Sequence, residues 1–334
     1  PPRPEWIAEN WKKARLLGAN TLLVIDEVQK VEGWSEVVKL LFDEDRGSEN
    51  LRVVILGSAS LALKVGLEES LLGRFELIRV HHWDAYESKE AFGWDLNTYL
   101  KYGGYPAAAN LINDEQRLRQ FMRDAVVEPI IAKDILALRQ ISNMSLFRQS
   151  FEIALSYPAR EISYQKLLGQ LQDKGNIATI KSYLSILEQV FVIKILEKYS
   201  TKVVKTKSSS PKIVPLAPAL VHAFSNPQRI ESDLAWRGQV FEAAVIAKIL
   251  TAPGEVYYWR QGKHEVDAVW RYDDMVLGIE IKSTRGHGDS ISGLAKFREN
   301  FPHAKTILLD EHLATELLMS REPRSLLEQY YEVS

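Results

Sequence analysis

The apolar residues of this chain follow two kinds of pattern, and the pattern changes along the sequence. Near the start, continuous apolar runs at 21–25 and 53–56 alternate with the helical spacing found at 5–17 and 34–45. Continuous runs indicate strands that are buried on both faces, because a half-exposed strand alternates apolar with polar residues. We therefore predict that residues 1–94 form an α/β domain whose parallel sheet is covered by helices on both faces.

The middle of the chain shows helical patterns followed by a compact mixed segment. Residues 95–155 contain the Gly-Gly/Pro breaker "YGGYP" but no strong strand pattern, and they are predicted to form a helical lid. Residues 156–207 contain two amphipathic helices joined by the turn "DKGN", then two β-rich runs, "FVIKILEKY" and "TKVVKTK". This order predicts a winged helix in which the two runs pair as the wing.

The C-terminal part, residues 208–334, returns to an α/β pattern. Helices are predicted at 235–250 and 292–300, and strands at 255–260, 265–272, 275–283 and 305–310. The second and third of these strands are separated only by Asp273-Asp274, which predicts a hairpin. The fold class predicted for the whole chain is therefore multi-domain α/β.

Composition and charge limit the classes of function. The 334 residues suffice for two or three domains, and 46% of them are apolar. Because 42 basic and 44 acidic residues nearly cancel, nucleic-acid binding would need a local basic patch. The absence of cysteine excludes disulfides and thiolate metal sites, and it fits a reducing cytoplasm. We find no apolar run of about 18 residues and no signal-peptide core, so we expect a cytoplasmic protein without a membrane partner.

The first candidate site follows the strand at 21–25, where "LLVIDE" ends in Asp26 and Glu27. In a P-loop ATPase, an acid at this position helps to hold Mg²⁺, and a second carboxylate orients the attacking water. Ser58 ends the neighbouring run and is predicted to sense the γ-phosphate, whereas Arg74 is a candidate arginine finger for a neighbouring subunit. The alternative is that the two acids only solvate the rim of an ordinary α/β sheet.

The phosphate cradle that such a site needs is missing from this sequence. No Gly-x-x-x-x-Gly-Lys-Ser/Thr motif occurs, and Gly262-Lys263 is followed by His264 and lies in another predicted domain. Without the backbone N–H groups and the lysine of that loop, little holds the β- and γ-phosphates. We therefore expect this chain to bind ATP weakly or not at all.

Several stretches in order along the chain carry a family resemblance. They are "TLLVIDEVQKVEGW", "VVILGSAS", "SLLGRFELIRV", "YLKYGGYPAAAN", "FMRDAVVEPIIAKDI" and "WRGQVFE…YYWRQGKHEVDAV…IEIKS". Together they resemble the prokaryotic AAA-superfamily ATPases that carry a C-terminal domain of unknown function. The resemblance implies that Asp26 and Glu27 are the Walker B acids, Ser58 the sensor and Arg74 the arginine finger. It also implies ATP with Mg²⁺ as ligands, and an oligomer such as a ring.

The same resemblance implies that a segment of the family is absent. The N-terminal P-loop strand and helix of these ATPases have no counterpart in this sequence, so the chain resembles a truncated ATPase with a partial P-loop-type parallel sheet. ATP is then an expected partner only if that segment is present.

The second candidate site is the hairpin that turns at Asp273-Asp274. A symmetric turn pairs Asp267 with Glu280 and Glu265 with Lys282. Two carboxylates directly opposite each other repel by tenths of a kcal/mol or more (an order-of-magnitude figure), unless a cation lies between them. Because oxygen ligands suit Mg²⁺ or Mn²⁺, Asp267 and Glu280 are predicted metal ligands, with Lys282 orienting water or phosphate.

These residues match the constellation of the PD-(D/E)XK nuclease fold, with Glu242 on the preceding helix as its fourth member. The C-terminal domain of the resembling family is similar to that fold. The resemblance implies a metal-bound water that attacks a phosphodiester. The alternative is structural, with Glu265 and Lys282 as a cross-strand ion pair and Asp267 on a solvated face.

Basic residues around the predicted winged helix are candidates for DNA contacts. Lys181 faces outward from the second helix, and the segment after it offers Lys202, Lys205, Lys207 and Lys212 with no acid among them. Four phosphate contacts would give a clear salt dependence of binding. The alternatives are a solvated linker or a winged helix that binds a protein.

Three functions follow from these features. The first is an AAA-type ATPase that couples its nucleotide state to DNA or a protein partner. The second is a metal-dependent DNA nuclease, and the third is a non-enzymatic DNA-binding or adaptor module.

Overall fold

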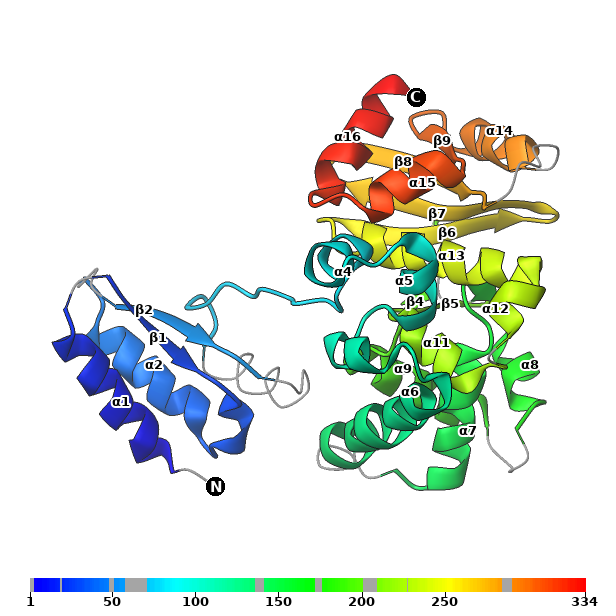
Figure 1. Ribbon diagram of the computed structural model, residues 1–334. Helices are drawn as coiled ribbons and strands as arrows, with labels where there is room; N and C mark the ends of the chain where they lie inside the picture. Colours follow the sequence, from blue (N-terminus) through cyan, green and yellow to red (C-terminus); the bar gives the residue numbers. More distant parts are fainter. Residues whose placement is uncertain are drawn as a thin grey trace. The chain divides into compact units, whose positions relative to one another are not determined.

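The chain forms two compact units, which we describe one at a time. The computed structural model describes residues 3–18, 20–47, 51–57, 71–135, 141–171, 176–200, 209–226, 228–283 and 290–334. The first unit is drawn from residues 1–80 and 130–140, and the second from residues 81–129 and 141–334. Figure 1 shows the elements of each unit. In the described part of the chain, no helix is both long and apolar enough to cross a membrane.

The described residues of the first unit contain two parallel strands. Strands β1 (Thr21–Ile25) and β2 (Leu51–Ile55) pair in parallel, with Thr21 opposite Leu51 and Ile25 opposite Ile55. The helices are α1 (Pro4–Leu16) and α2 (Trp34–Glu44), with a 3₁₀ turn at Val28–Lys30 and a π-helical stretch at Ile130–Ile135. The strands and helices predicted from the sequence are confirmed here within about two residues, because the apolar runs and the proline at the start of α1 mark their ends.

Both helices of the first unit cover the same face of its sheet. Trp11 of α1 and Val38 of α2 lie in one apolar cluster with Ile25 at the end of β1. On the opposite face, Leu22 and Val24 are 55% and 50% exposed. The prediction of helices on both faces is therefore wrong for the described residues of this unit, because only one face of β1 and β2 is packed.

The second unit begins with a helical region. Its helices are α4 (Ala85–Phe92), α5 (Leu96–Tyr102), α6 (Glu115–Phe121) and α7 (Met144–Leu155), with a 3₁₀ turn at Pro106–Leu111 and a π-helical turn at Met122–Val127. Each of the four helices follows an Asp or Asn whose side chain accepts a hydrogen bond from the backbone N–H three residues on. These caps satisfy N–H groups that the first turn of a helix leaves unpaired.

A small antiparallel sheet follows, and its central strand comes last in the sequence. The elements are β3 (Arg160–Glu161), α8 (Tyr164–Leu168), α9 (Ile177–Gln189), β4 (Ile193–Leu196) and β5 (Lys212–Pro215). The strand order is β3-β5-β4, so β5 is hydrogen-bonded on both sides and all four of its residues are buried. The predicted wing partner of β4 at 201–207 lies outside the described residues. The predicted boundary at 208 assigns β5 to the C-terminal domain, yet both of its partner strands precede that boundary.

The C-terminal sheet has four described strands, in the order β6-β7-β8-β9. They are β6 (Glu255–Gln261), β7 (His264–Tyr272), β8 (Met275–Ile281) and β9 (Lys305–Leu309), antiparallel except for the parallel pair β8 and β9. The predicted hairpin register is confirmed, since Ala268 pairs with Ile279 and Tyr272 with Met275. The two-residue loop fixes this register because it leaves the strands no slack.

Helices cover both faces of the C-terminal sheet. Helix α14 (Ser290–Asn300) packs Phe297 among Val269 and Val276 on one face. The other face is covered by α13 (Leu234–Ile249), α15 (Glu311–Leu318) and α16 (Pro323–Val333), and the shorter helices α11 (Pro218–Phe224) and α12 (Arg229–Ser232) lead into α13.

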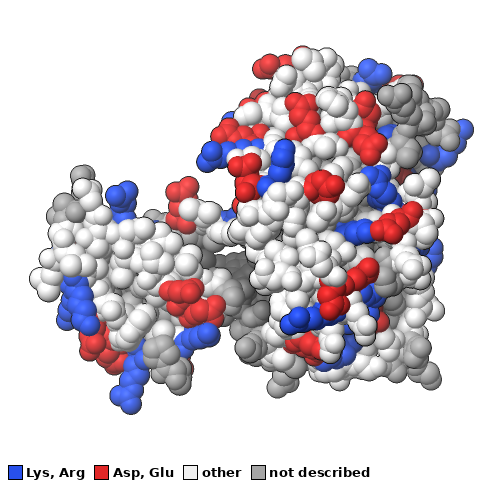
Figure 2. Space-filling model, viewed as in Figure 1, with Lys and Arg blue, Asp and Glu red and all other residues white. Residues whose placement is uncertain are grey.

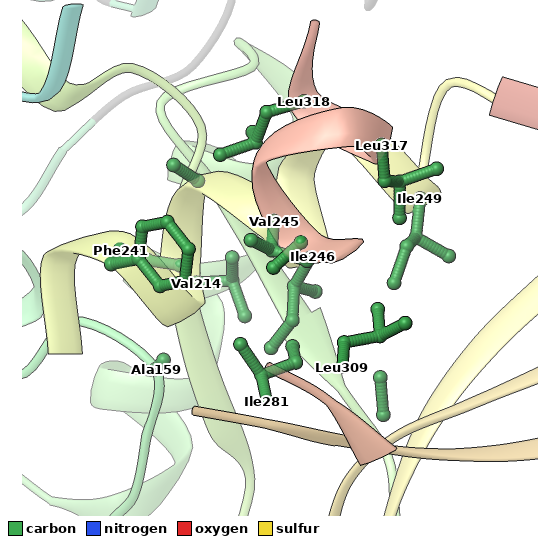
Figure 3. Packing of buried hydrophobic residues seen from close by; sticks show 14 of the residues in the cluster. Ala159, Val214, Phe241, Val245, Ile246, Ile249, Ile281, Leu309, Leu317 and Leu318 are labelled. Carbon is green, nitrogen blue, oxygen red and sulfur yellow. The ribbon is translucent and has the colours of Figure 1, made fainter. Parts of the chain in front are cut away.

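Helix α13 lies at the centre of the largest apolar core. Figure 3 shows Phe241 of α13 near Val214 of β5, and Val245 and Ile246 of the same helix toward Leu317 of α15. The same cluster contains core residues of β8 and β9. The small sheet and the C-terminal sheet therefore share one core, which fixes β5 against the C-terminal sheet.

We expect Ile246→Ala to lower the free energy of unfolding of the second unit by about 2–5 kcal/mol, because it leaves a cavity in this core. Leu234→Ala, on the exposed start of the same helix, is the matched control and should change it by less than about 0.5 kcal/mol. Urea unfolding followed by tryptophan fluorescence measures both. Equal losses in the two variants would show that α13 is not the centre of the core.

Candidate functional site

Asp26 and Glu27 lie at the carboxyl end of β1, as predicted. Asp26 is exposed, and its Oδ1 accepts a hydrogen bond from the Glu27 N–H at 2.9 Å. The Glu27 backbone is left-handed, with φ at 53°, a conformation that non-glycine residues adopt rarely and mostly at turns. Its carboxylate pairs with the Lys30 ammonium at 2.7 Å. Asp26 is therefore open to solvent, and Glu27 is partly exposed beside Lys30.

The ends of β1 and β2 are tied together beside these acids. The Leu56 N–H donates to the Ile25 carbonyl at 2.8 Å, and the Val28 N–H donates to the Leu56 carbonyl at 3.2 Å. Parallel strands bring their carboxyl ends to one edge, which is where open α/β sheets bind ligands. Ser58 follows directly after this edge but lies outside the described residues, so its sensor role stays a prediction.

Arg74, the predicted arginine finger, is engaged within the first unit. Its Nε and Nη2 donate to the two carboxylate oxygens of Asp43 at 2.9 and 3.1 Å. The Asp43 side chain raises the pKa of Arg74, and the guanidinium lowers the pKa of Asp43. A role toward a nucleotide would require this two-bond pair to open, so the finger assignment also stays a prediction.

The four residues of the second candidate site come together in the C-terminal half of the second unit. Asp267 and Glu280 are only 7% and 5% exposed, so the alternative that Asp267 lies on a solvated face is wrong. Asp267 Oδ2 accepts a hydrogen bond from the Ile281 N–H at 2.9 Å. The Lys282 ammonium lies 2.8 Å from Glu280 Oε1, and Glu242 joins from α13.

A fifth residue, Lys212 of β5, occupies the middle of this group. Its side chain has no exposed surface, and its Nζ lies 2.6 Å from Glu242 Oε1 and 3.4 Å from Asp267 Oδ1. The Nζ also donates to the Asp267 backbone carbonyl at 3.1 Å and lies 3.5 Å from Glu265 Oε1. The prediction that Lys212 belongs to a basic segment facing DNA is therefore wrong.

One signal in the sequence pointed to the position of Lys212. It precedes the apolar residues Ile213 and Val214, and Pro211 comes before it, so it starts a buried run rather than extending a charged one. A lysine at such a place is buried only when carboxylates pair with it. The local sequence pattern could not identify the residues that pair with it, because Glu242 follows 30 residues later and Asp267 follows 55 residues later.

Burial and mutual repulsion shift the ionisation of the carboxyl groups. Burial, followed by the charge of Asp267, raises the pKa of Glu242 to about 8 and the pKa of Glu280 to about 7. Burial by itself would lower the pKa of Lys212, but the charges of Glu242, Asp267 and Glu265 outweigh it and raise that pKa. Lys212 therefore stays charged. Because their pKa values are raised, Glu242 and Glu280 keep protons near neutral pH, which lowers the negative charge of the cluster.

A divalent metal does not fit this arrangement. Asp267 Oδ1 faces the Lys212 ammonium and Oδ2 accepts a hydrogen bond from the Ile281 N–H, so both oxygens already have a partner. Within the described residues, no group of three or more His, Cys, Asp or Glu side chains is arranged to hold a metal ion. In this cluster, Glu280 Oε2 is buried without a hydrogen-bond partner, and Glu242 Oε1 has the Lys212 ammonium beside it at the place a metal would take.

The other predicted contacts involve Glu265 and the lysines proposed to bind DNA. The cross-strand pair of Glu265 with Lys282 is wrong, because Glu265 instead lies 3.7 Å from Arg260 and 3.5 Å from Lys212. Lys181 lies over the Tyr164 ring at 4.7 Å. Lys202, Lys205 and Lys207 lie outside the described residues. On the face shown in Figure 2, basic side chains are mixed with acidic ones rather than gathered into one patch.

Three family models match successive parts of the chain. Residues 3–89 match an AAA domain, residues 93–231 match a domain of unknown function (DUF8612), and residues 237–319 match another (DUF4143). The N-terminal part is AAA-like. This confirms the coarser part of the family resemblance, an AAA-type segment followed by domains of unknown function.

Relatives with sequence similarity are themselves uncharacterised proteins. Those of Mycobacterium tuberculosis and Mycobacterium bovis are 28% identical over 281 residues, which is 80% of this chain and 60% of each relative. One of Methanocaldococcus jannaschii is 27% identical over 200 residues, covering 54% of this chain and 44% of the relative. The chain thus spans about three fifths of the length of the mycobacterial relatives.

Among solved structures, a Walker-type ATPase of Pyrococcus abyssi is similar, with 18% identity and a TM-score of 0.43. The similarity covers 66% of this chain and 67% of that one. Similarity at this level carries no argument about the fold or the function of this chain.

We expect Glu280→Gln to flatten the pH dependence of stability of the second unit. Between the ordinary pKa of 4.5 and the folded value of about 7, the folded state holds a proton that the unfolded state has lost. Stability therefore falls as the pH rises through this window, and the wild type should lose up to about 3 kcal/mol more than the variant. Urea unfolding at several pH values measures this, with Glu332→Gln on the exposed end of α16 as control. Parallel curves for wild type and Glu280→Gln would contradict it.

Proposed function

We propose that the first unit contributes the acidic half of an AAA-type ATP-hydrolysing site. The observation that carries the proposal is the pair Asp26 and Glu27 at the carboxyl end of a parallel strand, within the segment that matches an AAA domain. The match by itself indicates only an AAA domain. The position of the two acids at the strand end is what favours ATP hydrolysis. The partner to which nucleotide state is coupled, whether DNA or a protein, is part of the proposal and not of the match.

The two acids have separate tasks in this proposal. Asp26 is exposed and carries a carboxylate beyond the strand end, so it suits contact with Mg²⁺ through a bound water. Glu27 sits one residue later on a left-handed backbone and would orient the attacking water and accept its proton. Its present pair with Lys30 would have to open, which is feasible because exposed ion pairs contribute little to stability.

Nucleotide affinity is the weak point of this chain. Because the sequence contains no Gly-x-x-x-x-Gly-Lys-Ser/Thr, it lacks the loop motif that would hold the phosphates beside these acids. We propose that ATP hydrolysis takes place only in a form of the protein that has a phosphate-binding loop beside β1. In P-loop proteins this loop holds the phosphates next to the acids at the strand end.

Calorimetric titration of the 334-residue chain with Mg²⁺-ATP should therefore show no binding in the micromolar range. A dissociation constant near 1 μM corresponds to about −8 kcal/mol, which two acids cannot supply to a negatively charged ligand. Binding at that level would mean that another segment of this chain binds phosphate.

The role of Glu27 is tested in a form of the protein that contains a phosphate-binding loop. Glu27→Gln keeps the size of the side chain but removes its basicity, so ATP hydrolysis should fall by about 10²–10⁴-fold while ATP binding is kept. Glu36→Gln, on the exposed side of α2, is the matched control and should hydrolyse ATP like the wild type. Unchanged hydrolysis by Glu27→Gln would overturn the proposed role.

The nuclease and DNA-binding hypotheses have weaker support. The chain order α7, β3, α8, α9, β4, β5, with β5 central in the small sheet, supports a winged helix as an architecture. The basic segment proposed to contact DNA loses Lys212, which is buried. The nuclease hypothesis needs a metal between Asp267 and Glu280, but the Lys212 ammonium already lies beside Asp267. We therefore propose neither nuclease activity nor DNA binding as a second function.

A further inference from the structure

Glu242, Asp267 and Glu280 are the acids expected of a metal centre, but the cation among them is the Lys212 ammonium. The Lys212 ammonium has ion-pair distances to Glu242 and Asp267 of 2.6 and 3.4 Å and is fully buried. We propose that Lys212 is the permanent counter-cation of this carboxylate cluster, so that the second unit neither needs nor binds a divalent metal at this place. The proposal does not rest on the nucleotide chemistry of the first unit.

The first argument is that the lysine and a metal exclude each other. Metal–oxygen bonds of about 2.0–2.2 Å would require Glu242 and Asp267 to turn their oxygens from the ammonium toward the ion. The ammonium would then lie within a few ångströms of a doubly charged ion and without water. Like charges at such distances repel by several kcal/mol even at a protein-like effective dielectric constant (order of magnitude). One cation must therefore leave before the other can enter.

The second argument is that Lys212 cannot easily leave. It is the first residue of β5, and its backbone pairs with Glu161 of β3 on one side and Leu196 of β4 on the other. The next two residues, Ile213 and Val214, have no exposed surface. The backbone that carries the ammonium is therefore held on both sides. Lys212 is thus a built-in part of the fold rather than a lid over a metal site.

The third argument comes from the bonding that remains in the cluster. Asp267 is fully engaged by Lys212 and the Ile281 N–H, and one oxygen of Glu280 is engaged by Lys282. Glu242 Oε1 has the Lys212 ammonium beside it at 2.6 Å, and Glu280 Oε2 is buried without a hydrogen-bond partner. The ammonium thus lies beside acids that would otherwise be candidate metal ligands.

A consequence for the fold follows from this assignment. Lys212 belongs to the small sheet, whereas Glu242 lies on α13 and Asp267 on β7. The ion pairs therefore join the small sheet to the C-terminal sheet by charge as well as by the apolar core. In a metal-dependent centre the same junction would loosen when a chelator removed the metal, but a lysine-filled centre is indifferent to chelators.

The test measures Mn²⁺ binding and thermal stability of the full chain, with and without Lys212. For the wild type we expect no stoichiometric Mn²⁺ binding by calorimetry or paramagnetic resonance up to about 1 mM, and the same Tm in EDTA and in Mn²⁺. Lys212→Ala removes the charge and leaves space, so its Tm should fall in EDTA. Mn²⁺ at about 1 mM should then raise that Tm by about 5–10 °C.

Lys212→Met is the matched control, because it removes the charge but fills the space. Its Tm should fall like that of Lys212→Ala, but Mn²⁺ should not restore it. Rescue of Lys212→Ala and not of Lys212→Met supports the proposal. Failure of Mn²⁺ to raise the Tm of a folded Lys212→Ala variant contradicts it.

The wild type decides the matter if both Lys212 variants fail to fold. Stoichiometric Mn²⁺ binding by the wild type that is lost in Asp267→Asn would overturn the proposal, since it would place a metal beside the lysine. Absence of such binding in the wild type, together with a Tm that EDTA leaves unchanged, supports it.

Discussion

A buried ammonium among buried carboxylates is the interaction on which the second unit depends. Moving one lysine out of water costs several kcal/mol (order of magnitude), and only well-placed partners offset that cost. For Lys212 these partners come from α13 and β7, far along the chain from β5. Satisfying the charge therefore requires that the small sheet and the C-terminal sheet meet in one orientation. Removing a single member would leave the others unbalanced, so the cluster acts as one unit rather than as separate pairs.

The apolar core reinforces the same junction. Helix α13 carries both Glu242 and the core residues Phe241 and Ile246, and Figure 3 shows these core residues facing β5 and α15. Apolar packing supplies most of the free energy but little directional preference, whereas ion pairs with fixed distances select one register. We infer that packing holds the two sheets together and that Lys212 specifies how they are aligned.

The first unit differs in two ways. Its candidate catalytic acids are exposed, and only one face of its described sheet is packed. Asp26 and Glu27 follow β1 at the edge where such sheets bind ligands. On one face of β1, the apolar residues Leu22 and Val24 are half exposed in the described structure. A two-stranded parallel sheet covered on one face is unusual, because parallel sheets are ordinarily buried on both. The half-packed sheet and the lack of a phosphate loop in the sequence are consistent with each other, since a P-loop sheet gains its cover and its cradle from the same neighbouring elements.

The sequence by itself determined the local features of this protein. The strands at β1 and β2, the hairpin register that sets Ala268 opposite Ile279, and the approach of Asp267 to Glu280 follow from apolar runs and a two-residue turn, which act over short distances. The AAA-like character of the N-terminal part was also readable from "LLVIDE" and its neighbours. Only the tertiary structure decided what lies between the carboxylates. Lys212 and Asp267 are 55 residues apart, and burial of a lysine depends on partners that no local pattern identifies. The same limit applies to the uncovered face of β1, because an apolar run records that a strand can be buried and not which element buries it.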